Sequence, residues 1–506
     1  MTNSPENPVS AGPAVMKAPR SGVKIRMYHP GGIGDCFLLA FPTRKGKPCY
    51  VLIDCGVLQG TPDDDGKLRA IAQDIAQATE KRLDILVATH EHWDHLSGFY
   101  LAKDIFDQIQ IDQVWFGWTE NPDDPQARQL GEKKRKVLQS LNMALDQLQA
   151  LDSASAQRAQ AVREVLVGFN GELGASDRMT TADILNYLRG QPRQGPQYLK
   201  PGDPPRQLPG VTGARVFTFG PPTQFTYLFQ SDPPKGQTYE PGPALDEFSA
   251  FDRAVRLNTQ DWNQMTLDEQ DQINLSLPFG RPAGVGLDQV GQITDRDFKK
   301  LVETYLHGAN LWQNIGQEWL WSSEALALKL DSDTNNTSLV LAIELSQNGK
   351  VLLFPGDAQA GSWLSWQDLS WPGEGVSGGE LKARDLLRRV VFYKTGHHGS
   401  HNATLSKDGL ELMQSPDLAT MIPVNRPQAD RKKWEMPAQA LFTALASKTH
   451  GRLLLADRGL TDHDLLADLG LQAGSYTFPA APKNFKFQVQ KDASGSVFWI
   501  ETTLSS

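Results

Sequence analysis

The chain has 506 residues, a formal net charge of −9 and an apolar content of 40%. This length exceeds a single simple core, so we expect one large domain with insertions, or two to three domains. Residues 1–22 are rich in Pro, Ser and Asn, and no apolar run reaches the length of a membrane span. We therefore expect a soluble, cytoplasmic protein with a disordered tail at residues 1–22. The acidic balance argues against broad nonspecific binding to nucleic acid, except through basic runs such as residues 131–138 and 429–434.

The three cysteines, Cys36, Cys49 and Cys55, are an odd set without CxxC spacing. Cys36 and Cys55 lie within apolar, strand-like runs. We expect buried thiols in a reducing compartment and no disulfide framework.

From residue 23 the pattern is typical of β-structure. Apolar or alternating runs at 23–30, 35–42 and 49–56 are separated by turn residues, which predicts a ladder of hairpins. Apolar residues at helical spacing over 64–79 predict a helix. A buried strand is expected at 82–89 and leads directly into a cluster of histidines.

The middle of the chain changes character twice. Residues 119–210 contain a long run of strong helix formers, which predicts a helical insertion. A core strand is expected within 211–222, and residues 223–333 form a second, irregular insertion. The strand pattern then resumes from residue 334, with a hairpin at an Asn-Gly turn, a β-α-β unit at 419–457 and a last hairpin near the C-terminus.

Three histidines and an aspartate are concentrated in the stretch ATHEHWDHLSGF, residues 88–99. Residues at i and i+2 of an extended segment point the same way, so His90 and His92 can bind one cation. Asp94 and His95 lie past the turn and can face a second cation. The spacing HxHxDH therefore predicts a two-metal site at the carboxyl end of a strand, where ligands bind in layered α/β folds.

Further candidate ligands follow two other apolar strands. Asp357 comes after a strand and a Pro-Gly turn, where a carboxylate that bridges two cations fits, although a strand-end Asp also serves as a cap or turn residue. His397 and His398 follow the strand at 388–393. Adjacent residues after a strand point apart, so we do not expect both histidines to be ligands.

Six segments, in this order, resemble the metallo-β-lactamase superfamily: IGDCFLL, VLIDCG, THEHWDHLSG, NNTSLVL, LLFPGD and YKTGHHGS. They are most similar to the branch that contains the hydrolase domain of the ComEC competence channel and phosphorylcholine esterases. The resemblance implies an α/β fold, the αββα sandwich of that superfamily, over residues 23–118, 211–222 and 334–460. Residues 119–210 and 223–333 would be two inserted segments, and residues 461–506 a C-terminal β extension.

The resemblance implies six ligands for two divalent ions, namely His90 and His92 for the first ion, Asp94, His95 and His398 for the second, and Asp357 as a bridge. Zinc is the expected metal, with manganese as the alternative. His398 is favoured as the ligand over His397 because family members often carry a Ser two residues after it, as Ser400 does here. His397 would then face the scissile phosphate, so Asp94 and His397 are the expected catalytic residues.

Other positions are expected to support the ligands. Asp54 resembles a strand-end Asp that orients the metal-binding loop, and it fits equally well as a turn residue before Gly56. Asp35 matches the GxGD turn of the branch, without an assigned role. Asn335 and Asn336 occupy the stretch in which many members supply a further histidine, so the His90/His92 site is expected to be open to water or substrate.

The implied function is a dinuclear metal-dependent hydrolase, a phosphodiesterase or nuclease that uses a metal-bridging hydroxide. Its substrate would be a phosphodiester, either nucleic acid or a small molecule. One alternative is hydrolysis of a lactone, thioester or β-lactam. Another is a scaffold protein that recruits a protein partner through the insertions and carries a vestigial metal site.

The insertions leave the sheet between motif-bearing strands and are expected to line the substrate crevice. Tryptophans near and within them could stack a base or enclose a cation, or could simply pack the insertions onto the core. These residues are Trp115, Trp118, Trp262, Trp312, Trp319 and Trp321.

Overall fold

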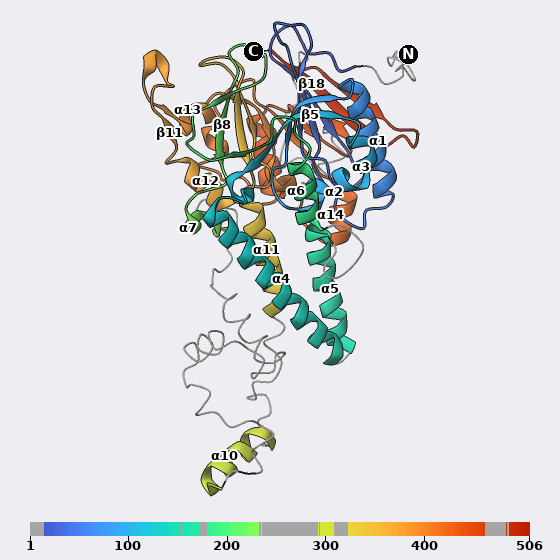
Figure 1. Ribbon diagram of the computed structural model, residues 1–506, viewed down its shortest axis with the longest axis vertical. Coiled ribbons are helices and arrows are strands. Elements are labelled where there is room, and N and C mark those ends of the chain that lie inside the picture. Colours follow the sequence, from blue (N-terminus) through green and yellow to red (C-terminus); the bar gives the residue numbers. More distant parts are fainter. Residues whose placement is uncertain are drawn as a thin grey trace, which may run out of the picture. The chain divides into compact units, whose positions relative to one another are not determined.

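The computed structural model describes residues 15–151, 153–171, 180–231, 234, 292, 294–307, 322–460, 482 and 485–505 (Figure 1). The described residues form two compact units. The larger unit lies within residues 1–130, 166–244 and 331–506, and the smaller within 131–165 and 245–330. The larger unit is of the α/β class, with helices and two mixed sheets.

The first sheet has eight strands in the order β17-β18-β1-β2-β3-β4-β5-β6. The strands from β17 to β3 are antiparallel, and β3 to β6 are parallel. Their bounds are Val23–Tyr28 (β1), Phe37–Phe41 (β2), Cys49–Ile53 (β3), Arg82–Val87 (β4), Gln110–Gly117 (β5), Pro196–Leu199 (β6), Phe487–Lys491 (β17) and Val497–Leu504 (β18). The expected ladder of hairpins at the start of the chain and the expected C-terminal hairpin are both confirmed. The C-terminal hairpin, β17 and β18, extends the first sheet beside β1.

The second sheet also has eight strands, in the order β16-β15-β14-β13-β10-β9-β8-β7. The pairs from β15 to β10 are parallel and the others antiparallel. Their bounds are Arg206–Gln207 (β7), Arg215–Gly220 (β8), Val340–Glu344 (β9), Val351–Phe354 (β10), Val390–Lys394 (β13), Ala419–Ile422 (β14), Leu453–Leu455 (β15) and Gly459–Leu460 (β16). The Asn-Gly turn between β9 and β10 is confirmed, and Asn348 adopts the left-handed backbone that such a turn requires (φ 57°).

Helices and short elements connect these strands. Their bounds are Asp64–Ala78 (α1), Trp93–Leu101 (α2), Lys103–Phe106 (α3), Pro125–Leu151 (α4), Ser153–Asn170 (α5), Thr181–Arg189 (α6), Phe225–Leu228 (α7), Arg296–His307 (α10), Ser322–Asn335 (α11), Ala360–Trp366 (α12), Ala383–Leu387 (α13), Arg426–Lys432 (α14), Gln439–Lys448 (α15), Ser370–Trp371 (β11) and Leu381–Lys382 (β12). The short 3-10 helices in the described part of the chain are Trp118–Glu120, Val376–Gly378, Gly396–Gly399 and Leu410–Leu412.

The apolar core accounts for the burial of the central strands of both sheets. In β2, Phe37 and Leu39 point into a cluster shared by the two sheets, while Leu38 points into a cluster shared with α1 and α2. Phe37 contacts Phe354 of β10 edge-to-face, with ring centroids 5.8 Å apart. The other face of the second sheet packs against α12 and α15. The sheets therefore face each other, and helices cover their outer faces.

The smaller unit contains parts of α4 and α5, α10 and the beginning of α11. Arg163 of α5 pairs with Asp146 of α4 at 2.8 Å. The buried apolar side chains of these two helices within the unit include Val137, Leu141, Leu145, Leu148 and Val162. Segments of both expected insertions thus contribute to one compact unit.

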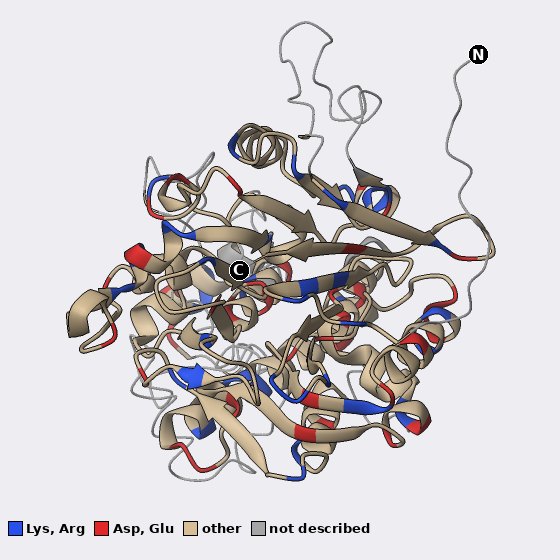
Figure 2. Cartoon of the chain, turned by 90° about the horizontal axis from the view of Figure 1, so that it is seen from above, with Lys and Arg blue, Asp and Glu red and all other residues tan. Residues whose placement is uncertain are grey.

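Two features bear on possible partners. Lys and Arg are interspersed with Asp and Glu over the described elements in Figure 2, so neither sign of charge dominates this view. Among the described residues, no helix is both long enough and apolar enough to cross a membrane.

Candidate metal centre

The HxHxDH segment follows β4 and forms the start of α2. His90, His92, Asp94 and His95 are all buried, with at most 1% of each residue exposed. Close packing against the segment after β3 holds this turn: Cys55 N–H donates to the His95 carbonyl at 2.8 Å. A Cβ atom on Gly56 would lie only 2.5 Å from the backbone carbonyl carbon of Asp94. Gly56 is therefore required for the close approach that places the histidines.

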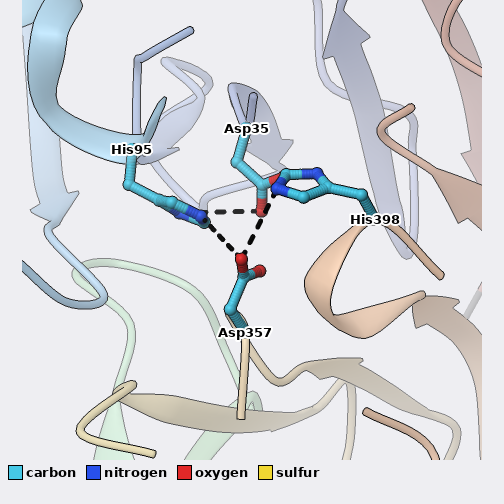
Figure 3. Close-up of side chains that lie close together, drawn as sticks. All are labelled: Asp35, His95, Asp357 and His398. Carbon is cyan, nitrogen blue, oxygen red and sulfur yellow. Dashed lines mark ion pairs between the residues drawn. The ribbon is translucent and has the colours of Figure 1, made fainter. Parts of the chain in front are cut away.

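A buried cluster that could hold a metal ion lies where the loops of the two sheets meet. It comprises Asp35, His95, Asp357 and His398, whose side chains point toward one another (Figure 3). Asp35 and His95 come from the first sheet, and Asp357 and His398 follow β10 and β13 of the second. The charged groups of this cluster are thus brought together only by the packing of the two sheets.

Hydrogen bonds to Nδ1 fix the orientation of both cluster histidines. His95 Nδ1 lies 2.8 Å from Asp54 Oδ2, and His398 Nδ1 lies 2.8 Å from the Pro423 carbonyl. Metal-binding histidines are usually held in this way, with one ring nitrogen on a carboxylate or carbonyl and the other toward the ion. The Nε2 atoms of both histidines are therefore the atoms available to a cation.

Two carboxylates lie against these Nε2 atoms. His398 Nε2 is 3.0 Å from Asp94 Oδ2 and 3.5 Å from Asp357 Oδ2. His95 Nε2 is 3.1 Å from Asp357 Oδ2 and 3.9 Å from Asp94 Oδ2. Ligand atoms about 2.1 Å from a tetrahedral zinc ion lie about 3.4 Å apart, which is close to these four distances.

Asp35 approaches the same histidines from their other side. Its oxygens lie 3.5 Å from His398 Nδ1 and 3.9 Å from His95 Nδ1. Both of those nitrogens already have closer partners, so Asp35 acts on the ligands more directly than on an ion. Asp94 lies outside this group of four, but its Oδ2 atom is 3.0 Å from His398 Nε2 and 3.9 Å from His95 Nε2.

The electrostatics of the centre keep the Asp357 carboxylate charged, whereas burial raises the pKa of Asp35. Burial opposes ionisation of Asp357, but Lys394, His95 and His398 outweigh it and hold the pKa of Asp357 well below its usual value. Burial also opposes the charged form of His95 and so lowers its pKa. The surrounding aspartates, Asp357 foremost, outweigh this effect and raise the pKa of His95 well above the ordinary range. Without a metal ion, protonated histidine therefore compensates the buried negative charge.

His90 and His92 form a separate pair of nitrogens. His90 Nε2 lies 3.0 Å from His92 Nδ1, and His92 Nε2 lies 3.4 Å from Asp331 Oδ1. Burial, followed by the neighbouring His95 and His92, lowers the pKa of His90 well below its usual value. A neutral His90 keeps a lone pair that a cation can use. Asp331 was not anticipated from sequence, because it lies in a helical segment just outside the motif that begins at Asn335.

The two histidines of the second cluster diverge, as expected for adjacent residues. Both have left-handed backbones (φ 44° and 52°), and their ring centroids lie 6.0 Å apart. His398 reaches Asp94 and Asp357, whereas His397 Nδ1 lies 2.8 Å from Ser400 Oγ. Ser400 Oγ also donates to Asn402 Oδ1 at 2.9 Å, and Gln359 Nε2 lies 3.4 Å from His397 Nδ1, so two neighbours hold this ring nitrogen. His397 Nε2 takes no part in these contacts, and burial first of all lowers the pKa of His397 to about 4.

Asp54, Asn336 and Asn335 occupy supporting positions. Asp54 accepts hydrogen bonds from the backbone and hydroxyl of Thr89 (2.8 and 2.6 Å), in addition to its contact with His95. Asn336 Oδ1 accepts from Gln359 N–H at 3.0 Å and so braces the segment after Asp357. Asn335 Nδ2 donates to Asp331 Oδ2 at 3.4 Å, next to the partner of His92.

A buried lysine within the centre was not anticipated from sequence. Lys394 is the last residue of β13, and its ammonium contacts Asp35 at 2.5 Å and Asp357 at 3.0 Å. The sequence does mark this position, because a lysine ends an otherwise apolar strand three residues before the histidine pair.

Of the six tryptophans near and within the insertions, the structure describes Trp115 and Trp118. Trp115 and Trp118 are 2% exposed, and Trp118 Nε1 donates to the Pro221 carbonyl at 2.9 Å. For these two side chains the structure therefore supports packing, the second of the two alternatives. The other four tryptophans named above lie outside the described residues.

No protein-family model matches the sequence, and no curated protein matches it either.

Proposed function

We propose that this chain is a metallo-β-lactamase-type hydrolase that binds two divalent ions and cleaves phosphodiester bonds. The observation that carries the proposal is the convergence of the His95 and His398 Nε2 atoms with the Asp94 and Asp357 carboxylates. The two facing sheets, with helices on their outer faces, are also what the αββα sandwich of this superfamily would require.

One ion would be held by His95, His398, Asp94 and Asp357. Asp94 Oδ1 is buried and has no hydrogen-bond partner among the described residues, as suits a carboxylate that faces a cation. A second ion would be held by His90 and His92, with Asp357 as the proposed bridging ligand. Imidazole and carboxylate ligands favour zinc, and manganese is the alternative.

Such ions, when bound, lower the pKa of water and neutralise charge on a phosphoryl oxygen. His397 is placed to move a proton beside them. Its backbone N–H donates to Asp357 Oδ1 at 3.1 Å, and Ser400 occupies its Nδ1 atom. In the tautomer with the proton on Nδ1, Nε2 can accept a proton as the bond to phosphorus forms and return it to the leaving oxygen.

An aromatic pair and a basic run border the centre and favour a nucleic-acid substrate. The ring of Phe169 lies 5.3 Å from that of His92 and stacks on Trp434, with centroids 5.8 Å apart and planes at 23°. Residues 431–433, Arg-Lys-Lys, immediately precede Trp434 and are exposed. Within the described part of the chain, no ion pair joins them to a carboxylate, so they are available to phosphates.

The test is release of p-nitrophenol from bis-p-nitrophenyl phosphate by protein stripped of metal and then reconstituted with zinc or manganese. The proposal expects release only with metal, and loss of release in Asp357→Asn. Metal-dependent cleavage of a lactone, thioester or β-lactam without phosphodiester release would favour the alternative hydrolase. No metal-dependent turnover of any of these would favour a scaffold with a vestigial site.

A further inference from the structure

Lys394 places a buried ammonium at the metal centre. Its side chain is 2% exposed. All three of its N–H groups have acceptors: Asp35 Oδ2 at 2.5 Å, Asp357 Oδ1 at 3.0 Å and the Gly356 carbonyl at 2.7 Å. The ammonium is therefore held in one orientation.

The two carboxylates that Lys394 contacts come from different sheets. Asp35 precedes β2 of the first sheet, and Asp357 follows β10 of the second. Apart from histidine, Lys394 is the cation that contacts both carboxylates in the described part of the chain. It therefore joins the two halves of the centre.

Lys394 also decides which oxygen of Asp357 faces the cluster. Asp357 Oδ1 accepts from Lys394 and from the backbone N–H of His397. Asp357 Oδ2 is left to face His95 Nε2 at 3.1 Å and His398 Nε2 at 3.5 Å. An ion would thus be offered one oxygen of this carboxylate in a fixed direction.

Asp35, Asp54, Asp94 and Asp357 are all buried within the same small volume. Removing the partner of a buried carboxylate leaves an uncompensated charge, which disfavours the folded arrangement. We propose that Lys394 is a positioning residue that assembles the metal centre before any ion binds, by joining Asp35 of one sheet to Asp357 of the other. The inference rests on the proposed metal centre but not on the identity of the substrate.

Charge repulsion alone would predict the opposite effect of Lys394 on metal affinity. A positive charge beside the centre repels a cation, so if repulsion were its only effect, removing Lys394 would tighten metal binding. Assembly predicts weaker binding instead, because loss of a group that orients the ligands usually lowers metal affinity about 10- to 100-fold.

The experiment measures zinc affinity by competition with a chromogenic chelator for the full chain and three variants. Lys394→Met removes the charge and keeps the length of the side chain. Lys394→Met/Asp35→Asn also removes one carboxylate, so it restores the charge balance and allows folding if the single variant is unstable. The matched control is Lys24→Met, which breaks the Lys24–Glu501 ion pair (2.9 Å) away from the centre.

The proposal expects both Lys394 variants to lose about 10- to 100-fold in zinc affinity, while Lys24→Met stays within about twofold of the wild type. It also expects a changed visible spectrum of bound Co²⁺ in the double variant, because the direction of Asp357 is no longer fixed. Wild-type affinity or tighter binding in the folded double variant would overturn it. A wild-type chain that binds no zinc would instead contradict the metal centre itself, and with it the proposed function.

Discussion

His398 Nε2 lies 3.0 Å from Asp94 Oδ2, although the two residues are 304 positions apart in the sequence. Asp94 is in the first turn of α2, after β4 of the first sheet, and His398 follows β13 of the second. This contact exists only when the two sheets pack face to face. The centre is therefore a product of the whole fold of the larger unit.

The divergence of His397 and His398 predicts different defects for the two residues. His398→Ala removes an Nε2 atom from the cluster, so zinc bound per chain and turnover should both fall. His397→Ala leaves the cluster intact and should retain zinc while losing turnover. Metal analysis of the two purified variants checks this, and the reverse pattern would assign the ligand role to His397.

Asp54 is predicted to act through the orientation of His95. Asp54 Oδ2 contacts both the Thr89 hydroxyl and His95 Nδ1. The amide of Asp54→Asn has only one acceptor oxygen and orients His95 less well, so zinc affinity should fall about 10- to 100-fold while the chain remains folded. Asp84→Asn is a suitable control, because Asp84 is also buried but binds the backbone of Tyr50. Equal affinity in both variants and the wild type would assign Asp54 to the turn alone.

The basic run beside Trp434 is predicted to bind the phosphates of a polymeric substrate. Lys432→Ala/Lys433→Ala should raise the KM for single-stranded DNA several-fold and weaken its dependence on salt, because each lost phosphate contact reduces that dependence. Turnover of bis-p-nitrophenyl phosphate should not change. Lys45→Ala/Lys47→Ala, in an exposed loop, serves as the control. Identical DNA kinetics in both double variants would exclude this run from substrate binding.

The thiols are predicted to be unreactive in the native chain. All three cysteines are buried, and burial raises the pKa of the Cys36 and Cys49 thiols. Since the thiolate is the reactive form, a colorimetric thiol reagent should titrate no cysteine in native protein and three after denaturation. Titration of one thiol per native chain would show that a cysteine is accessible.

Short-range patterns allowed much of the larger unit to be predicted. Alternating and apolar runs indicated the ladder of β1 to β3, the β9–β10 hairpin and the β14-α15-β15 unit. Periodicity reports only whether a segment has one or two buried faces, so it could not show that β17 and β18 extend the first sheet. The pairing of distant strands depends on which edges are left open by the rest of the fold.

The same limit applies to the centre. HxHxDH, Asp357 and the His397/His398 pair stood out because ligand-type residues followed apolar strands. Lys394 and Asp331 did not, because a lysine at a strand end and an aspartate in a helix are ordinary in a sequence. Their roles arise from contacts across more than 35 and 230 residues, respectively, which only the folded structure supplies.

The most direct test of the central claim is to titrate metal-free protein with zinc while measuring phosphodiester turnover and bound zinc together. The account predicts that p-nitrophenol release rises with zinc occupancy and reaches its maximum near two ions per chain. Fewer than one tightly bound zinc per chain, or release that does not follow occupancy, would contradict it.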